Sequence, residues 1–227
     1  MYGMYYNLDY LIYILPGFLL ALYAQSKIRA NFDKYSRVTN REGLTGRSVA
    51  EAILRNHGIY DVTIDRVRGS LTDHYDPSHK VLRLSEPVYD STSIAALGIA
   101  AHECGHAIQH HESYAPLSMR NAIVPAANLG SNLSFIFILI GLFAFEPLLK
   151  LGIALFAITV LFQLLTLPVE YNASHRAKVI LADGILSGEE MVGVERILSA
   201  AAMTYVASLL TAIGTLMRFI SMGRRRD

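Results

Sequence analysis

The sequence is poor in charge and contains a single cysteine. Asp, Glu, Lys and Arg make up 17% of its 227 residues, against about 25% in soluble domains. One cysteine, Cys104, excludes an intramolecular disulfide framework. The net charge of +1 gives no indication of a nucleic-acid partner, so none is expected.

Long uncharged stretches account for the low charge. They cover residues 10–26, 121–145, 151–169 and 197–217, and each is close to the roughly 20 residues with which a helix crosses a bilayer. A chain of this length could not bury four such helices in one small core. We therefore expect an integral membrane protein with three to four transmembrane helices.

The segment His102-Glu103-Cys104-Gly105-His106 has the H-E-x-x-H pattern. Histidines four residues apart on a helix are separated by about 40° around its axis, so both imidazoles can reach one zinc ion. Glu103 directly follows a ligand and could act as general base toward a water activated by the metal. A helix with two surface histidines and a solvated glutamate would carry the same letters, so the context must decide.

The context favours a helix around this motif. Ser91, Thr92 and Ser93 offer N-cap oxygens, and residues 94–108 contain no proline. The metzincin form of the motif would need Gly at position 109 and His at position 112, where this chain has Gln109 and Glu112. That class of zinc peptidase is excluded.

The third ligand must then come from elsewhere. On a continuing helix His110 would stand about 80° and two turns from His102, so His110 and His111 are instead expected at the helix C-terminus. Our choice is Glu170, which ends the uncharged run 151–169 and opens a polar stretch. An interfacial acid at the end of a membrane helix explains this position equally well.

The distribution of basic residues predicts an orientation. Seven of them follow the first run: Lys27, Arg29, Lys34, Arg37, Arg41, Arg47 and Arg55. By the positive-inside rule residues 27–120 face the cytoplasm, and a hairpin of runs 121–145 and 151–169 returns Glu170 to that side. A full fourth span would place Arg224, Arg225 and Arg226 outside, so either run 197–217 packs without crossing or the tail breaks the rule.

The region 27–120 is expected to hold a small soluble domain. Thr45–Asn56 has the pattern of an amphipathic helix with Gly58 just past its end, while Asp61–Arg68 and Lys80–Leu84 have the pattern of strands. By analogy with zinc peptidases we favour Lys80–Leu84 as an edge strand that pairs with an extended substrate, over an interior strand.

Four segments occur together and in order in this chain: Leu71–Pro77, Lys80–Ser85, Ser93–Gln109 and Pro168–Ser174. Together they resemble the YugP-type neutral zinc metallopeptidases of bacterial membranes, and the likeness extends from about Tyr23 to Phe219. The resemblance implies a membrane zinc peptidase of the gluzincin kind that holds one Zn²⁺ ion. In that pattern His102, His106 and Glu170 are the ligands and Glu103 is the catalytic residue.

One position departs from the wider gluzincin pattern. Relatives often carry an Asp four residues after the glutamate ligand, which holds a zinc-bound histidine through its other ring nitrogen. Here that position is Ser174, and Asn172 could contribute instead. Candidates for stabilising the oxyanion during hydrolysis, with His175 and Arg176 ranked first, are His74, Tyr75, Tyr171, His175 and Arg176.

The predicted fold is α+β, mainly α, with a zincin-like cytoplasmic domain that carries a short sheet. The expected segments are a transmembrane helix (1–26), the zincin-like catalytic region (27–120), a transmembrane hairpin (121–169), the third-ligand helix region (170–196) and a hydrophobic helix with a basic tail (197–227). We expect a multi-pass protein of the bacterial cell membrane, with the lipid bilayer and a peptide or protein substrate as its partners.

Three functions remain open at this stage. The first is a zinc endopeptidase that cleaves peptide bonds at the cytoplasmic membrane face. The second is an intramembrane site-2-type protease using Asp183, because Leu181-Ala182-Asp183-Gly184 weakly resembles an element of that class, although the surrounding stretch is too polar for hydrocarbon. The third is a catalytically silent zinc-binding scaffold, against which the presence of Glu103 argues.

Overall fold

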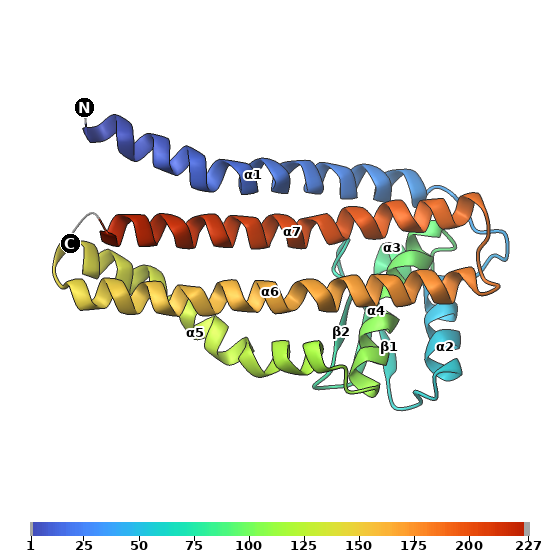
Figure 1. Ribbon diagram of the computed structural model, residues 1–227. Coiled ribbons are helices and arrows are strands. Elements are labelled where there is room, and N and C mark those ends of the chain that lie inside the picture. Colours follow the sequence, from blue (N-terminus) through green and yellow to red (C-terminus); the bar gives the residue numbers. More distant parts are fainter. Residues whose placement is uncertain (1, 225–227) are drawn as a thin grey trace. The chain divides into compact units, whose positions relative to one another are not determined.

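The computed structural model describes residues 2–224, with side chains from Leu11 onward. In chain order the elements are α1 (Tyr2–Tyr35), α2 (Gly46–Asn56), β1 (Thr63–Val67), β2 (His74–Asp76), β3 (Val81–Ser85), α3 (Glu86–Tyr89), α4 (Ile94–His111), α5 (Ala115–Phe143), α6 (Glu146–Ala182) and α7 (Glu189–Arg224) (Figure 1). The described chain is thus mainly helical with one small sheet, as the sequence predicted.

The elements fall into two compact units. The helical unit comprises the residues up to Ala24, Ser118–Pro168 and those from Met203. The mixed unit comprises Gln25–Leu117 and Val169–Ala202. Helices α1, α5, α6 and α7 each contribute residues to both units.

The helical unit is held together by close helix contacts at glycines. A Cβ at Gly141 of α5 would lie 2.2 Å from the backbone nitrogen of Leu149 in α6, and a Cβ at Gly214 of α7 would lie 1.9 Å from the carbonyl oxygen of Tyr13 in α1. Backbone contacts of this kind are typical of membrane helices, which associate through small residues.

The four predicted apolar runs lie in helices that are long and apolar enough to cross a membrane, judged by length and composition. Those helices are α1 from Leu11 onward, α5, α6 and α7. Large apolar side chains such as Phe18, Phe135 and Leu164 are more than half exposed on them. Such exposure is costly in water and suits a lipid environment.

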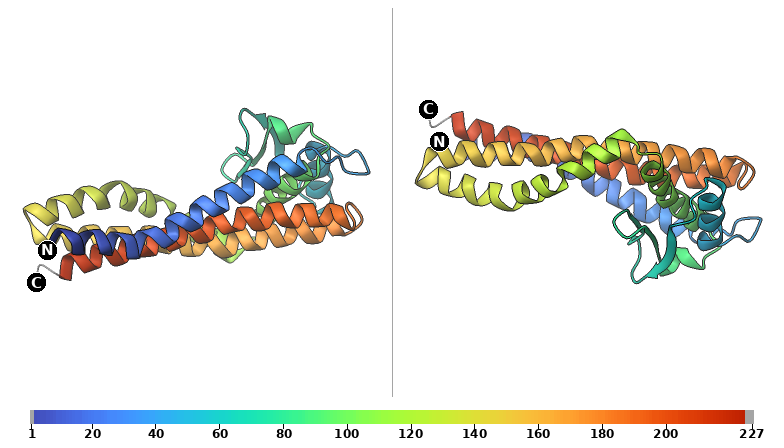
Figure 2. Two further views of the ribbon diagram at one scale, coloured as in Figure 1. Left: turned by 90° about the horizontal axis from the view of Figure 1, so that it is seen from above. Right: turned by 90° about the horizontal axis from the view of Figure 1, so that it is seen from below.

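Helix α4 forms the centre of the mixed unit. Figure 2 shows it between the small sheet on one side and the mixed-unit parts of α6 and α7 on the other. Its buried surface consists largely of small side chains, which let neighbours approach from several directions: Ala95, Ala96, Gly98, Ala100, Ala101, Gly105 and Ala107. The core around it also includes Leu82 and Leu84 of β3, Ile53 of α2 and Ile197 of α7.

The helix ends follow the predicted capping chemistry. Of the three candidate caps before α4, Ser93 is the one whose side chain accepts from the backbone N–H of Ala96. Thr45 caps α2 through a capping box with Ser48. Gly58, with φ of 71°, follows α2 as predicted, and His110 and His111 form the last turn of α4.

The sheet corrects the prediction about its strands. Its order is β1-β3-β2, with β1 parallel and β2 antiparallel to β3. The predicted edge strand is therefore the central strand, and its buried Leu82 and Leu84 explain why. The prediction of an edge position for Lys80–Leu84 was wrong because its second neighbour, β2, is only three residues long and shows no alternation by which the sequence would reveal it.

Candidate metal centre

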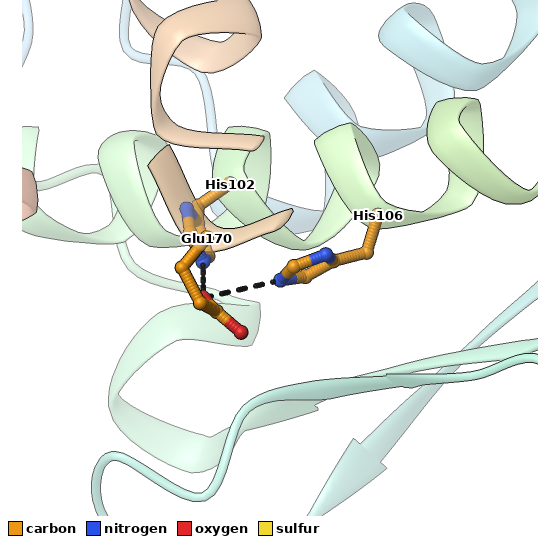
Figure 3. Close-up of side chains that lie close together, drawn as sticks. All are labelled: His102, His106 and Glu170. Atoms are coloured by element: carbon orange, nitrogen blue, oxygen red, sulfur yellow. Dashed lines mark ion pairs between the residues drawn. The ribbon is translucent and has the colours of Figure 1, made fainter. Parts of the chain in front are cut away.

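Two helices bring the three predicted ligands together. His102 and His106 project from α4, and Glu170 projects from α6 (Figure 3). One ligand atom from each residue lies within 4.8 Å of the others. All three side chains belong to the mixed unit and are largely shielded from solvent, with Glu170 only 4% exposed.

The separations between these atoms suit a metal ion. The Oε2 atom of Glu170 is 3.3 Å from Nε2 of His102 and 3.5 Å from Nε2 of His106. A tetrahedral zinc ion with bonds of about 2.0–2.1 Å holds its ligand atoms about 3.3–3.4 Å apart. Two imidazoles and one carboxylate are also a donor set that zinc prefers in catalytic sites.

A glycine within the motif allows this approach of the two helices. A Cβ at Gly105 would lie 2.8 Å from the carbonyl oxygen of Ala173 and 3.1 Å from its Cα. Any larger residue at position 105 would therefore push the backbone of α6 away from α4. The glycine thus sets how near Glu170 can come to the histidines.

Each histidine has a hydrogen-bond partner on its other ring nitrogen. The Nδ1 atom of His102 is 3.2 Å from Oγ of Ser174. The Nδ1 atom of His106 is 3.0 Å from Oε1 of Gln109. Such partners orient metal-binding imidazoles and fix which nitrogen carries the proton.

Carboxylates dominate the electrostatics of the centre. Burial raises the pKa of Glu103, the His102 and His106 imidazoles oppose this rise, and the carboxylates of Glu170 and Asp73 add to it. Burial by itself would lower the pKa of His106, but its hydrogen bond to Glu170 and the charges of Glu103 and Glu170 outweigh that effect, so the net shift is upward. The carboxylates therefore favour a positive charge at this place, which a bound divalent cation would supply.

Two residues at the centre were missed in the sequence. Asp73 accepts hydrogen bonds from the backbone N–H of Ser85 at 2.7 Å and from its hydroxyl at 2.9 Å. Gln109 is completely buried. A glutamine three residues after His106 lies on the same side of the helix, so this spacing was a signal that could have revealed it.

The other predicted residues of the site lie as follows. Arg176 donates to Oδ1 of Asn172 at 2.8 Å and forms an ion pair with Glu112 at 2.7 Å. Tyr75 forms a hydrogen bond of 2.8 Å with Nδ1 of His110. The side chains of Tyr171, His175 and His74 are exposed. No feature of these contacts tests which of them stabilises an oxyanion, and that assignment stays a prediction.

Asp183 lies apart from the three grouped ligands. It follows the last residue of α6 and is exposed. Helix α6 runs without a break from Glu170 to Ala182, so at 1.5 Å per residue Asp183 lies about 20 Å along the helix from Glu170. This separation is too great for both carboxylates to reach one ion.

Cys104 takes no part in the centre. It is fully buried, and its sulfur faces the carbonyl oxygen of Ala50 in α2 at 3.7 Å. Burial raises the pKa of the thiol, and the nearby Glu103 adds to this shift. The residue therefore fills space in the core, and its thiol is protected from the chemistry of an exposed thiolate.

Comparison with known proteins agrees with this geometry. Residues 10–224 match the model of a family described as "putative neutral zinc metallopeptidase". The chain belongs to this family. It is also 49% identical over 203 residues to the "Putative membrane protease YugP" of Bacillus subtilis (strain 168), covering 88% of this chain and 90% of that relative. No solved structure matches the chain.

Membership of the family is what the resemblance in the sequence predicted. The region that matches the family model contains all three residues that could hold a metal ion, His102, His106 and Glu170. The name of the bacterial relative and the four long apolar helices together fit a membrane protein.

Proposed function

We propose that this protein is a membrane-bound zinc endopeptidase with a single Zn²⁺ ion held by His102, His106 and Glu170. The observation that carries the proposal is the convergence of both Nε2 atoms on one buried carboxylate oxygen of α6, at 3.3 and 3.5 Å. Membership of a zinc metallopeptidase family supports the choice of metal and of reaction class.

Glu103 is the proposed general acid and base. Bound zinc would polarise the scissile carbonyl and lower the pKa of a water molecule to about 7. Glu103 lies between the two histidine ligands in the chain and is buried beside them, a position that suits a group that must both take and return a proton. It accepts the proton of the attacking water and then passes it to the departing amine.

The substrate is proposed to bind as an extended strand at the edge of the sheet. The observed edges are β1 and β2, and β2 packs against α4, the helix that carries the histidines. A peptide added to an edge strand gains main-chain hydrogen bonds independently of its sequence. We therefore expect the substrate to pair with β2 and not with the central strand β3.

We further propose that the mixed unit faces the cytoplasm of a bacterial cell. The basic residues that follow the first apolar run support this orientation. With α5 and α6 as a hairpin of two spans, for which both helices are long and apolar enough, Glu170 then lies on the same side as the histidines. The length and apolar composition of α7 support it as a fourth span, which would leave its Arg224 end on the outer side, against the positive-inside rule.

The alternative functions have weaker support. An intramembrane protease using Asp183 would need that exposed residue at the metal, about 20 Å along α6 from Glu170. In a catalytically silent zinc scaffold the buried Glu103 beside the ligands would have no role, because a structural zinc site needs no base.

The decisive experiment compares wild type with Glu103→Gln in detergent-purified protein. We expect the variant to bind zinc in the wild-type amount but to lose peptide hydrolysis by at least about 100-fold, as is typical when an acid–base group is removed. Zinc would be measured by atomic absorption and turnover with a fluorogenic peptide. Unchanged turnover would remove Glu103 from the mechanism, and zinc-free, inactive wild type would refute the proposal.

A further inference from the structure

Gln109 connects one metal ligand to the helix that carries another. It is completely buried, and its amide nitrogen lies 2.8 Å from the carbonyl oxygen of Val169 and 2.9 Å from Oδ1 of Asn172. Both of those residues flank Glu170 on α6. The amide oxygen of Gln109 lies 3.0 Å from Nδ1 of His106.

The direction of these hydrogen bonds is determined by Arg176. Its guanidinium can only donate, so the Asn172 atom 2.8 Å from its Nε must be the acceptor Oδ1. The ion pair of Arg176 with Glu112, at 2.7 Å, holds the guanidinium in place. The orientation of the Asn172 amide is thereby fixed.

The orientation of Gln109 follows from that of Asn172. Since Oδ1 of Asn172 also faces Gln109, the group presented to it must be the NH₂ of Gln109. The carbonyl oxygen of Val169 is a second acceptor at this position. It also requires the NH₂ group of Gln109 to face α6, so it supports the same orientation independently. The amide oxygen of Gln109 therefore faces His106.

An amide oxygen can only accept, so Nδ1 of His106 must carry the hydrogen. The neutral imidazole then has its lone pair on Nε2, the atom 3.5 Å from Glu170. The partner of His102 is different, because the hydroxyl of Ser174 can either donate or accept and does not select a tautomer.

We propose that Gln109 is a positioning residue of the metal centre, which holds His106 with Nε2 available to zinc and fixes that ligand relative to Glu170. The inference rests on the proposed function, because it assigns a role toward the same ion. Partners of this kind typically change metal affinity or activity by about 10- to 100-fold when they are removed.

The test measures the zinc affinity of full-length, detergent-purified variants by competition with a chromophoric chelator. Gln109→Met keeps the size of the side chain and removes both hydrogen-bonding functions, and we expect zinc affinity to fall by about 10- to 100-fold. The matched control is Ile108→Val, an equally buried neighbour on α4, which should leave zinc affinity unchanged. The visible spectrum of the Co²⁺-substituted protein should change in Gln109→Met alone.

A second variant separates positioning from packing. Gln109→Glu keeps an acceptor for His106 but sets a carboxylate oxygen against the two acceptors of Val169 and Asn172, so we expect it to regain part, but not all, of the affinity lost in Gln109→Met. If packing alone mattered, Gln109→Glu would bind zinc no better than Gln109→Met, which would overturn the proposal. If Gln109→Met does not fold, Gln109→Glu decides, since a positioning role keeps its affinity within about tenfold of wild type.

The outcomes distinguish the two proposals. If wild type and Gln109→Met bind zinc equally well, Gln109 has no positioning role, but the proposed peptidase function is unaffected. Wild type that binds neither Zn²⁺ nor Co²⁺ overturns both.

Discussion

At the scale of single residues, the centre depends on one carboxylate from α6 meeting two imidazoles from α4. Glu170 is buried, and both of its close histidine contacts are made through one oxygen, Oε2. A buried carboxylate is costly unless positive charge compensates it. A bound cation would provide that compensation, so metal binding and the folding of this part of α6 should stabilise each other.

Glu170→Ala should therefore remove zinc from the protein. We expect a loss of affinity greater than the about 10- to 100-fold typical of an indirect partner, measured as bound metal after dialysis. Asp183→Ala is the control, because Asp183 is exposed and distant along the same helix, and it should retain zinc. The reverse pattern would favour the intramembrane class of protease.

At the scale of secondary-structure elements, the distance between α4 and α6 is set by a glycine. Gly105 contacts the backbone of Ala173, whereas Gly98 on the same helix has room beside Val194, where an added Cβ would lie 3.4 Å from the nearest atom. The two glycines therefore differ in the space around them and form a matched pair for mutation.

Gly105→Ala should separate α4 from α6. We expect a destabilisation of about 1–3 kcal/mol, as for other overpacked sites, and weaker zinc binding because Glu170 is displaced. Gly98→Ala should be neutral, or stabilising by up to about 1 kcal/mol through helix propensity. Thermal unfolding and zinc titration of both variants check this, and an equal effect at the two positions would contradict it.

The hairpin of β2 and β3 is held by a network around Asp76. Its carboxylate accepts from His79 at 2.8 Å and from Arg83 at 3.0 Å. These hydrogen bonds, first that of His79, hold the pKa of Asp76 well below its usual range. A carboxyl group whose folded pKa is lowered stabilises the fold above its unfolded pKa of about 3.9 and loses this contribution as the pH falls.

Asp76→Asn should accordingly lower the Tm of the zinc-free protein at pH 7. The difference in Tm from wild type should shrink as the pH is taken from about 5 down to about 3, because Asp76 of the unfolded chain takes up a proton there while the folded carboxylate stays ionised. Thermal scans at several pH values measure it. A difference that stays constant over this range would show that the charge of Asp76 contributes nothing.

At the scale of the whole molecule, the proposed membrane orientation places two of the connections between helices on opposite sides of the membrane. The segment around Glu42 joins α1 to α2 in the mixed unit, and Ala144 lies between α5 and α6 in the helical unit. Both positions are exposed. If α5 and α6 form a hairpin of two spans, these residues lie on opposite sides of the membrane.

Single cysteines at these positions test the orientation. In intact cells an impermeant maleimide should label Ala144→Cys but not Glu42→Cys, which should react only after lysis. Wild type is the control, because its only cysteine, Cys104, is buried and should remain unlabelled. Labelling of Glu42→Cys in intact cells would reverse the proposed orientation.

The sequence by itself determined the local features of this protein. Several features depend only on neighbours within a few turns: the apolar runs, a hydroxyl cap within residues 91–93, the end of α4 at the paired histidines and the i, i+4 spacing of His102 and His106. Such patterns can be interpreted without the fold because their periodicity is a property of one helix or one strand.

Only the tertiary structure decided what depends on residues far apart in the chain. Ser174 and His102 are separated by 72 positions, and Gln109 and Val169 by 60. The central place of β3 was likewise set by pairing with two strands, one of them too short to recognise. Spacing along a chain does not fix such contacts, because they depend on how closely two helix backbones can approach, and here Gly105 beside Ala173 allows that approach.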